Sequence, residues 1–94
     1  MSVISTESAL EFLREDKEEL NDDEIYELNR MILASETFVK KYTGIADISE
    51  HEDLKLATLF VIQSMYDNRS FVVEDDKLHP TAKTILDMNS ENLL

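Results

Sequence analysis

The side chains that could bind a metal ion are few and clustered at one point. The chain has two histidines, and His51 lies in the segment EHED at residues 50–53. Imidazole and carboxylate groups are metal ligands, but all four residues are close neighbours, and acids are expected at a helix start anyway. No second ligand cluster is marked by spacing, and His79 has no partner visible in the sequence. The sequence therefore predicts no metal site.

Catalytic patterns are also missing. The acidic run at residues 15–24 lacks the glycine and the alternating oxygen ligands of a calcium loop. The single glycine, Gly44, lies in YTGI and is typical of a helix end, so no phosphate-binding loop or nucleophile elbow is formed. The absence of cysteine removes thiol catalysis, disulfides and cysteine-based zinc sites. We therefore expect no enzyme activity.

Aromatic residues at helical spacing could be interpreted as a cofactor site. Phe38, Tyr42, Phe60 and Tyr66 recur in this way. Such residues are much more often part of a hydrophobic core, and this is the interpretation we adopt. No cofactor is predicted.

The elements that position these residues are predicted to be helices. A chain of 94 residues suits one domain, residues 1–94, and 43% apolar residues are enough for one core. One glycine and one proline leave few tight turns, which disfavours a sandwich or barrel. The predicted fold class is all-α, a small bundle of about four helices around a buried central helix.

The net charge of −12 argues against binding to nucleic acid phosphates or to an anionic membrane surface. Residues 1–24 contain nine acids and two bases, a net charge of −7, which indicates a solvated face or a surface for a basic partner. No apolar run approaches the ~18 residues of a membrane span, and the first residues do not resemble a signal peptide. A soluble cytoplasmic protein is expected.

Two amphipathic helices are predicted in the first half of the chain. The first spans about residues 6–14. The second begins after an N-cap at Asn21 or Asp22, and Gly44 ends it in the left-handed conformation. The apolar stripe of the second helix predicts core residues, namely Leu28, Ile32, Val39 and Tyr42.

The third predicted helix is the most apolar. Ser49 and Glu52 have the spacing of a capping box, which places the helix at residues 50–68. Between residues 56 and 66 apolar side chains cover nearly the whole circumference, as in a buried helix. A strand is the rival interpretation of LFVI, but the length and the capped start favour a helix. The predicted core residues are Phe60, Val61 and Met65.

Residues 70–79 have two interpretations, which both stay open. Phe71, Val72 and Val73 fit a short strand that returns through residues 77–79 as a β-hairpin. A lone hairpin is marginal in water, so it either packs on the bundle or presents an edge to another chain. Pro80 suits the first position of a final helix over residues 81–88.

Four stretches, taken in order, resemble the phage head–tail connector family. The stretch LEFLREDKEELNDDEIYELNRMI is similar to that family's short helix, acidic turn and long helix. ASETFVKKYTGI resembles its helix end with an aromatic residue before Thr-Gly, and DLKLATLFVIQSMYDNRS resembles its central apolar helix. HPTAKTILDMN falls where the family has a proline-led last helix. The basic, aromatic ending that usually follows is absent.

This resemblance implies a head-completion adaptor of a tailed phage or prophage, a structural protein and not an enzyme. Family members form a homo-oligomeric ring, about twelvefold, between the portal protein and the next connector or tail protein. DNA passes through the ring without specific binding. The implied locations are the host cytoplasm during assembly and the head–tail junction of the virion. The implied contact residues are Phe71, Val72, Val73, Leu78 and Pro80.

Two other classes of function stay open. An acidic helical protein could mimic DNA and inhibit a nucleic-acid-binding enzyme, although more than half of the net charge precedes residue 25. A small helical enzyme or regulator would need polar groups in the third helix for its ligand. Its only candidates are Thr58, Gln63 and Ser64, which are more simply packing or surface residues.

Overall fold

Four α-helices and one short 3-10 helix form the described part of the chain. The computed structural model describes residues 3–71, 73 and 77–90. In order, the elements are α1 (Thr6–Leu13), η1 (Lys17–Glu19), α2 (Asp22–Thr43), α3 (Glu52–Asn68) and α4 (Pro80–Asn89). These residues include no strand, so the described structure is all-α as predicted.

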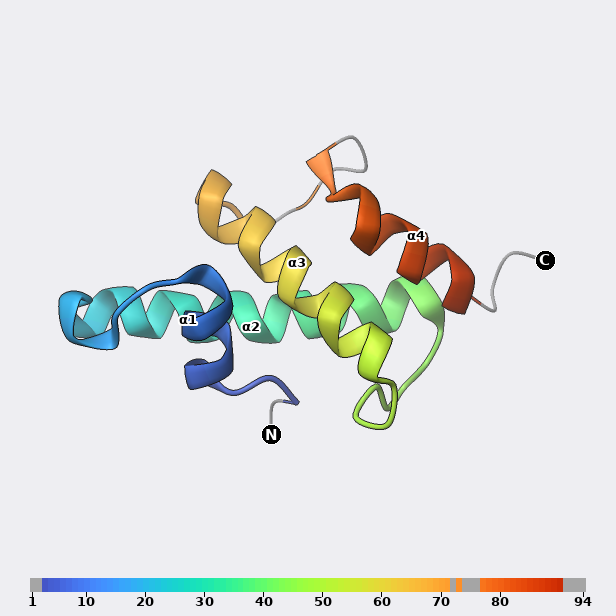
Figure 1. Cartoon of the computed structure of the whole chain (residues 1–94), viewed down its shortest axis with the longest axis horizontal. Helices are drawn as coiled ribbons and strands as arrows, with labels where there is room; N and C mark the ends of the chain where they lie inside the picture. The colour runs from blue at the N-terminus through green and yellow to red at the C-terminus, as the bar shows by residue number, and fades with distance from the viewer. Residues whose placement is uncertain (1–2, 72, 74–76, 91–94) are drawn as a thin grey trace.

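The helices are arranged in two layers. α2 is the longest helix, and α1 and α3 cross in front of it (Figure 1). α4 packs against α3 and against the C-terminal part of α2. The smallest dimension of the molecule is 17 Å, which leaves room for two layers of helices whose axes lie about 8–10 Å apart.

The core has two clusters of buried residues, and α3 contributes to both. One joins the C-terminal half of α2 to α3 and α4, and includes Val39, Leu54, Val61 and Leu86. The other joins α1 to the N-terminal half of α2, and Ile62 is its member from α3. α3 therefore contacts each of the other three helices and links the two clusters, as α2 also does.

Both ends of α2 have the local chemistry expected from the sequence. The side chain of Asn21 accepts a hydrogen bond from the Glu24 amide at 2.8 Å, and the Glu24 carboxylate accepts one from the Asn21 amide at 3.0 Å. This reciprocal capping box satisfies two amides that lack partners inside the helix. At the other end Gly44 has φ 78° and ends α2 in the left-handed conformation, as predicted.

One carboxylate of α2 is buried and attaches the N-terminal segment to the bundle. Glu36 is only 4% exposed, and its Oε2 atom accepts a hydrogen bond from the Ile4 amide at 2.8 Å. A buried acid needs such a donor, since the loss of hydration would otherwise be uncompensated. The bond holds Ile4 against the core, where its side chain is buried beside α1 and α2.

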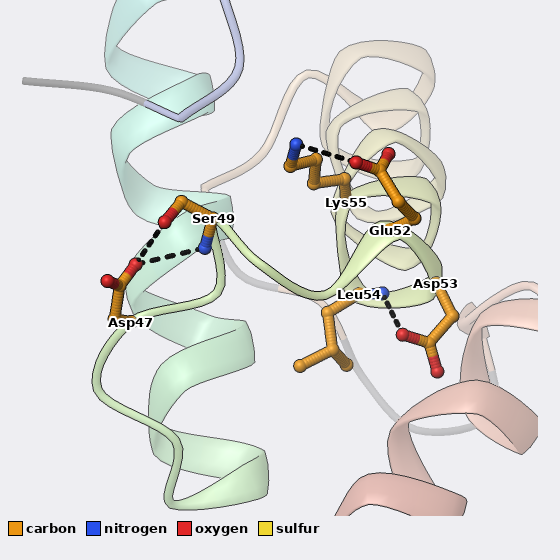
Figure 2. Close-up of polar contacts among 6 residues, drawn as sticks. All are labelled: Asp47, Ser49, Glu52, Asp53, Leu54 and Lys55. Atoms are coloured by element: carbon orange, nitrogen blue, oxygen red, sulfur yellow. Dashed lines mark hydrogen bonds and ion pairs between the residues drawn. The ribbon is translucent and has the colours of Figure 1, made fainter.

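The predicted capping box of α3 is wrong. α3 begins at Glu52, its N-cap is His51, and no side chain caps it. The amide and hydroxyl of Ser49 instead donate to Asp47 Oδ1 at 3.0 and 2.6 Å (Figure 2). Asp47 therefore competes for the Ser49 side chain, and this local turn delays the helix by two residues.

α3 is less enclosed than its sequence predicts. Leu54, Thr58, Val61 and Met65 are buried, but Leu56 is 40% exposed. Leu56 lies on the side of α3 opposite to its buried residues, and none of the described helices covers that side closely enough to bury it. An apolar circumference is therefore not sufficient to bury every face of a helix in so small a protein.

The residues predicted for the core fall into two groups. Leu28, Ile32, Val39, Val61 and Met65 are at most 2% exposed, whereas Tyr42 and Phe60 are half-buried and pack on the edge of the larger cluster. Ile4 and Ile48 are also buried, although both lie outside helices and belong to no periodic pattern.

Candidate assembly surface

The connection between α3 and α4 holds the residues predicted to contact other subunits. Arg69 ends α3 in the left-handed conformation with φ 51°, and its amide is bonded to the carbonyls of Met65 and Tyr66. The hairpin predicted here falls partly on Val72 and residues 74–76, which lie outside the described residues. Its described members are not in strands.

Two residues of this connection point inward. Leu78 is only 5% exposed and belongs to the larger core cluster, and half-buried Val73 packs against the same cluster. Both side chains attach the connection to the bundle by burying apolar surface. Neither offers a large contact area to a partner unless the connection moves.

Two other residues predicted as contacts are exposed. The ring of Phe71 is 42% exposed, and the guanidinium carbon of Arg30 lies 5.5 Å from its centroid. Pro80 is exposed at the first position of α4. An arginine held over an aromatic face is a common component of protein interfaces, because both groups are weakly hydrated.

His79 organises the start of α4. Its Nδ1 atom accepts a hydrogen bond from the Thr81 amide at 3.1 Å, so the imidazole is the N-cap of α4. The same ring stacks on Phe60 with centroids 4.2 Å apart, and Phe60 meets Phe12 edge-on at 5.2 Å. This row of rings joins α1, α3 and α4, and gives His79 the partner that the sequence does not reveal.

The surroundings of two tyrosines raise the pKa values of their hydroxyl groups. The Tyr42 hydroxyl donates to the carboxylate of Asp87, and this hydrogen bond, followed by burial, raises the pKa of Tyr42. Burial is also the main reason why the pKa of Tyr66 is raised, and the nearby Arg69 guanidinium partly opposes it. Both hydroxyls therefore stay protonated at neutral pH and act in packing and hydrogen bonding.

Metal-ligating side chains do not cluster in the described part of the chain. These residues contain no group of three or more histidine, aspartate or glutamate side chains placed to hold a metal ion. An open hollow of about 470 Å³ lies over the end of α1, and its lining includes Glu7, Arg14 and Lys17. No described helix is long and apolar enough to cross a membrane.

The sequence did not reveal a second exposed cluster, which lies on α2. Tyr26 and Leu33 are 64% and 54% exposed, and Arg30 lies between them with its guanidinium 5.9 Å from the Tyr26 ring. The three residues are spaced by four and three positions, which is a signal that could have identified them. The apolar stripe on the opposite face of the same helix is stronger, so that stripe was identified from the sequence and the spacing of these three residues was not.

Comparison with known proteins gives no match to a family model, to a curated protein or to a solved structure.

Proposed function

We propose that the chain is a structural adaptor at the head–tail junction of a tailed phage or prophage. It assembles as a ring of copies on the portal protein and offers a surface to the next connector or tail protein. It works by assembly and not by catalysis. Its places of action are the host cytoplasm during assembly and then the virion.

The observation that carries this proposal is the order of the elements. A short α1, an acidic connection, a long α2 that ends in Thr-Gly, an apolar α3 and a proline-led α4 follow one another as in the resembling family. The capping box at Asn21 and the left-handed Gly44 give physical reasons for two of these boundaries.

The connection between α3 and α4 supports a role in contacts between subunits. In the proposal, the inward-pointing Val73 and Leu78 attach the connection to the bundle, and the exposed Phe71 and Pro80 meet the neighbouring copy. The buried part of α3 is the scaffold that holds this connection.

The acidic surface is compatible with passage of DNA through a ring. Carboxylates repel phosphates, so a wall that carries them does not retain the duplex. With a net charge of −12, the chain has enough acids to form such a wall.

The role of Phe71 is tested by the substitution Phe71→Asp. Because this side chain is 42% exposed, we expect circular dichroism and the melting temperature to stay unchanged while ring formation on the purified portal is lost. Electron microscopy of the portal with and without the adaptor measures the ring.

Leu56→Asp is the matched control, since Leu56 is 40% exposed and lies on α3 away from the connection. Rings that form with Leu56→Asp and not with Phe71→Asp support the assigned surface. Normal rings with Phe71→Asp would exclude it.

The partners themselves are identified by capture of the tagged chain from a lysate of its induced host, followed by mass spectrometry. Recovery of portal and tail-joining proteins supports the adaptor. Recovery of a nuclease or another DNA-binding enzyme would instead favour the acidic inhibitor.

A further inference from the structure

One face of α2 is free of the other helices. The buried residues of α2, among them Leu28, Ile32 and Val39, point toward the rest of the bundle. Tyr26 and Leu33 lie on the opposite side of the helix and are exposed. α1 and α3 cross one side of α2 in Figure 1, and the exposure of Tyr26 and Leu33 indicates that none of the described helices covers the opposite side.

The exposed face carries a regular stripe. Its members are all exposed and follow one another at steps of three, four, three, four and three residues, the spacing of helices that pair along a seam. We call this set the α2 stripe, and it comprises Asp23, Tyr26, Arg30, Leu33, Thr37 and Lys40. The stripe runs for about 26 Å along the helix, at 1.5 Å per residue.

The stripe is complementary to a second copy of itself in reverse direction. Two antiparallel copies can be placed so that Asp23 of each faces Lys40 of the other at both ends of the seam. In the same register Tyr26 faces Thr37, and Arg30 faces Leu33, so each contact occurs twice about a twofold axis. The Leu33 side chain then packs on the aliphatic part of Arg30.

Charge selects the antiparallel direction. Asp22 and Asp23 lie in the first turn of α2, and Lys40 and Lys41 lie in its last turn. Antiparallel pairing brings the acidic end of one copy to the basic end of the other, whereas parallel pairing would bring like charges together.

The groups that would pair are available. The guanidinium of Arg30 lies over the rings of Tyr26 and Phe71, which holds the arginine in place near the middle of the stripe. Neither Asp23 nor Lys40 forms an ion pair among the residues that the structure describes. Prior ordering of Arg30 reduces the entropy lost when a second copy packs on it.

We propose that the free chain forms an antiparallel twofold dimer through the α2 stripe, with the symmetry axis between Arg30 and Leu33. The occupant of this face is a second copy of the same chain. The inference rests on α2 and is independent of the adaptor role, because a dimer in solution can exist whether or not rings form on a portal.

Charge reversal tests the pairing of the helix ends. Sedimentation equilibrium of the purified full chain, at concentrations up to about 1 mM, measures the dissociation constant of the dimer. Asp23→Lys and Lys40→Asp each bring like charges together at both ends of the seam, and we expect each to weaken the dimer about tenfold. The variant with both substitutions restores both pairs with reversed sign, and its dissociation constant should return to within about threefold of the parent value.

The reversals need a control, because they also oppose the dipole of α2. Circular dichroism shows that each variant is folded at the temperature of the experiment. Glu50→Lys makes the same change in net charge as Asp23→Lys at an exposed position outside α2, and it should leave the dissociation constant within about threefold of the parent value.

Cysteine pairing tests the register independently. The chain has no cysteine, so Tyr26→Cys and Thr37→Cys each introduce a single thiol. A mixture of the two variants should be linked rapidly by mild oxidation, because the register brings positions 26 and 37 of opposite copies together. Each variant alone should link slowly, since its two thiols lie eleven residues apart along the seam, or about 16 Å.

Four results would overturn the proposal. The first two are a parent chain that stays monomeric over the whole concentration range and a dimer that neither charge reversal weakens. The third is a double variant as weak as the single ones. The fourth is either cysteine variant alone linking as fast as the mixture, which would indicate parallel pairing or random collision.

Discussion

At the scale of single residues, Phe60 shows that a residue on an apolar helix need not be fully buried. Its ring stacks on His79 at 4.2 Å and meets Phe12 edge-on at 5.2 Å, yet it is half-buried and lies at the edge of the larger cluster. Part of its surface is already in water, and so truncation leaves an open depression instead of a closed cavity. The cost should be below that of a fully enclosed phenylalanine.

We expect Phe60→Ala to lower the free energy of unfolding by about 2–3 kcal/mol, because apolar burial and two aromatic contacts are lost. Urea denaturation followed by circular dichroism measures it. Leu56→Ala on the exposed side of α3 should cost less than about 1 kcal/mol. Equal costs at the two positions would mean that the row of rings adds nothing to stability.

At the scale of elements, the N-terminus of α2 and the N-terminus of α3 are similar in sequence but differ in structure. Both have a small polar residue followed three positions later by glutamate, Asn21 with Glu24 and Ser49 with Glu52. Only the first pair forms a capping box, because the side chain of Ser49 is bonded to Asp47 in the preceding turn.

This difference predicts unequal effects of two substitutions. Asn21→Ala removes the acceptor for the Glu24 amide and should destabilise the protein by about 1 kcal/mol. Ser49→Ala loses one exposed hydrogen bond to Asp47 and should cost less than about 0.5 kcal/mol. Chemical denaturation of both variants measures the difference. A larger loss at Ser49 than at Asn21 would show that the serine does cap α3.

At the scale of the whole molecule, charge opposes the compact state. The net charge of −12 is spread over a body 45 Å long, and the Debye length falls from about 30 Å at 0.01 M salt to about 8 Å at 0.15 M. Repulsion between distant carboxylates is therefore strong at low salt and largely screened at physiological salt.

We expect the melting temperature of the monomer to rise by about 4 °C or more over this salt range, equivalent to about 1 kcal/mol in a domain of this size. Scanning calorimetry at low protein concentration measures it. Glu11→Gln combined with Glu18→Gln removes two exposed charges and should reduce the rise. A melting temperature that falls with salt would mean that local ion pairs outweigh the repulsion.

The sequence by itself determined the elements of this protein. Helical periodicity, the cap at Asn21, the left-handed Gly44 and the proline at the start of α4 depend on neighbours within one or two turns, so they can be inferred from local sequence. Ala82 and Leu86, which lie four positions apart on α4, are both buried, in keeping with the same periodicity.

Only the tertiary structure decided which surfaces are covered. Ile48 is buried although no pattern marks it, Leu56 is exposed although its helix is apolar nearly all round, and His79 finds its aromatic partner at Phe60, far away in the chain. The spacing of the α2 stripe is present in the sequence, but its exposure was decided by how the described helices pack. Burial depends on contacts between segments that are distant in the chain. In a two-layer protein each helix has a face that the other layer does not cover, and the sequence of the helix alone does not determine which face that is.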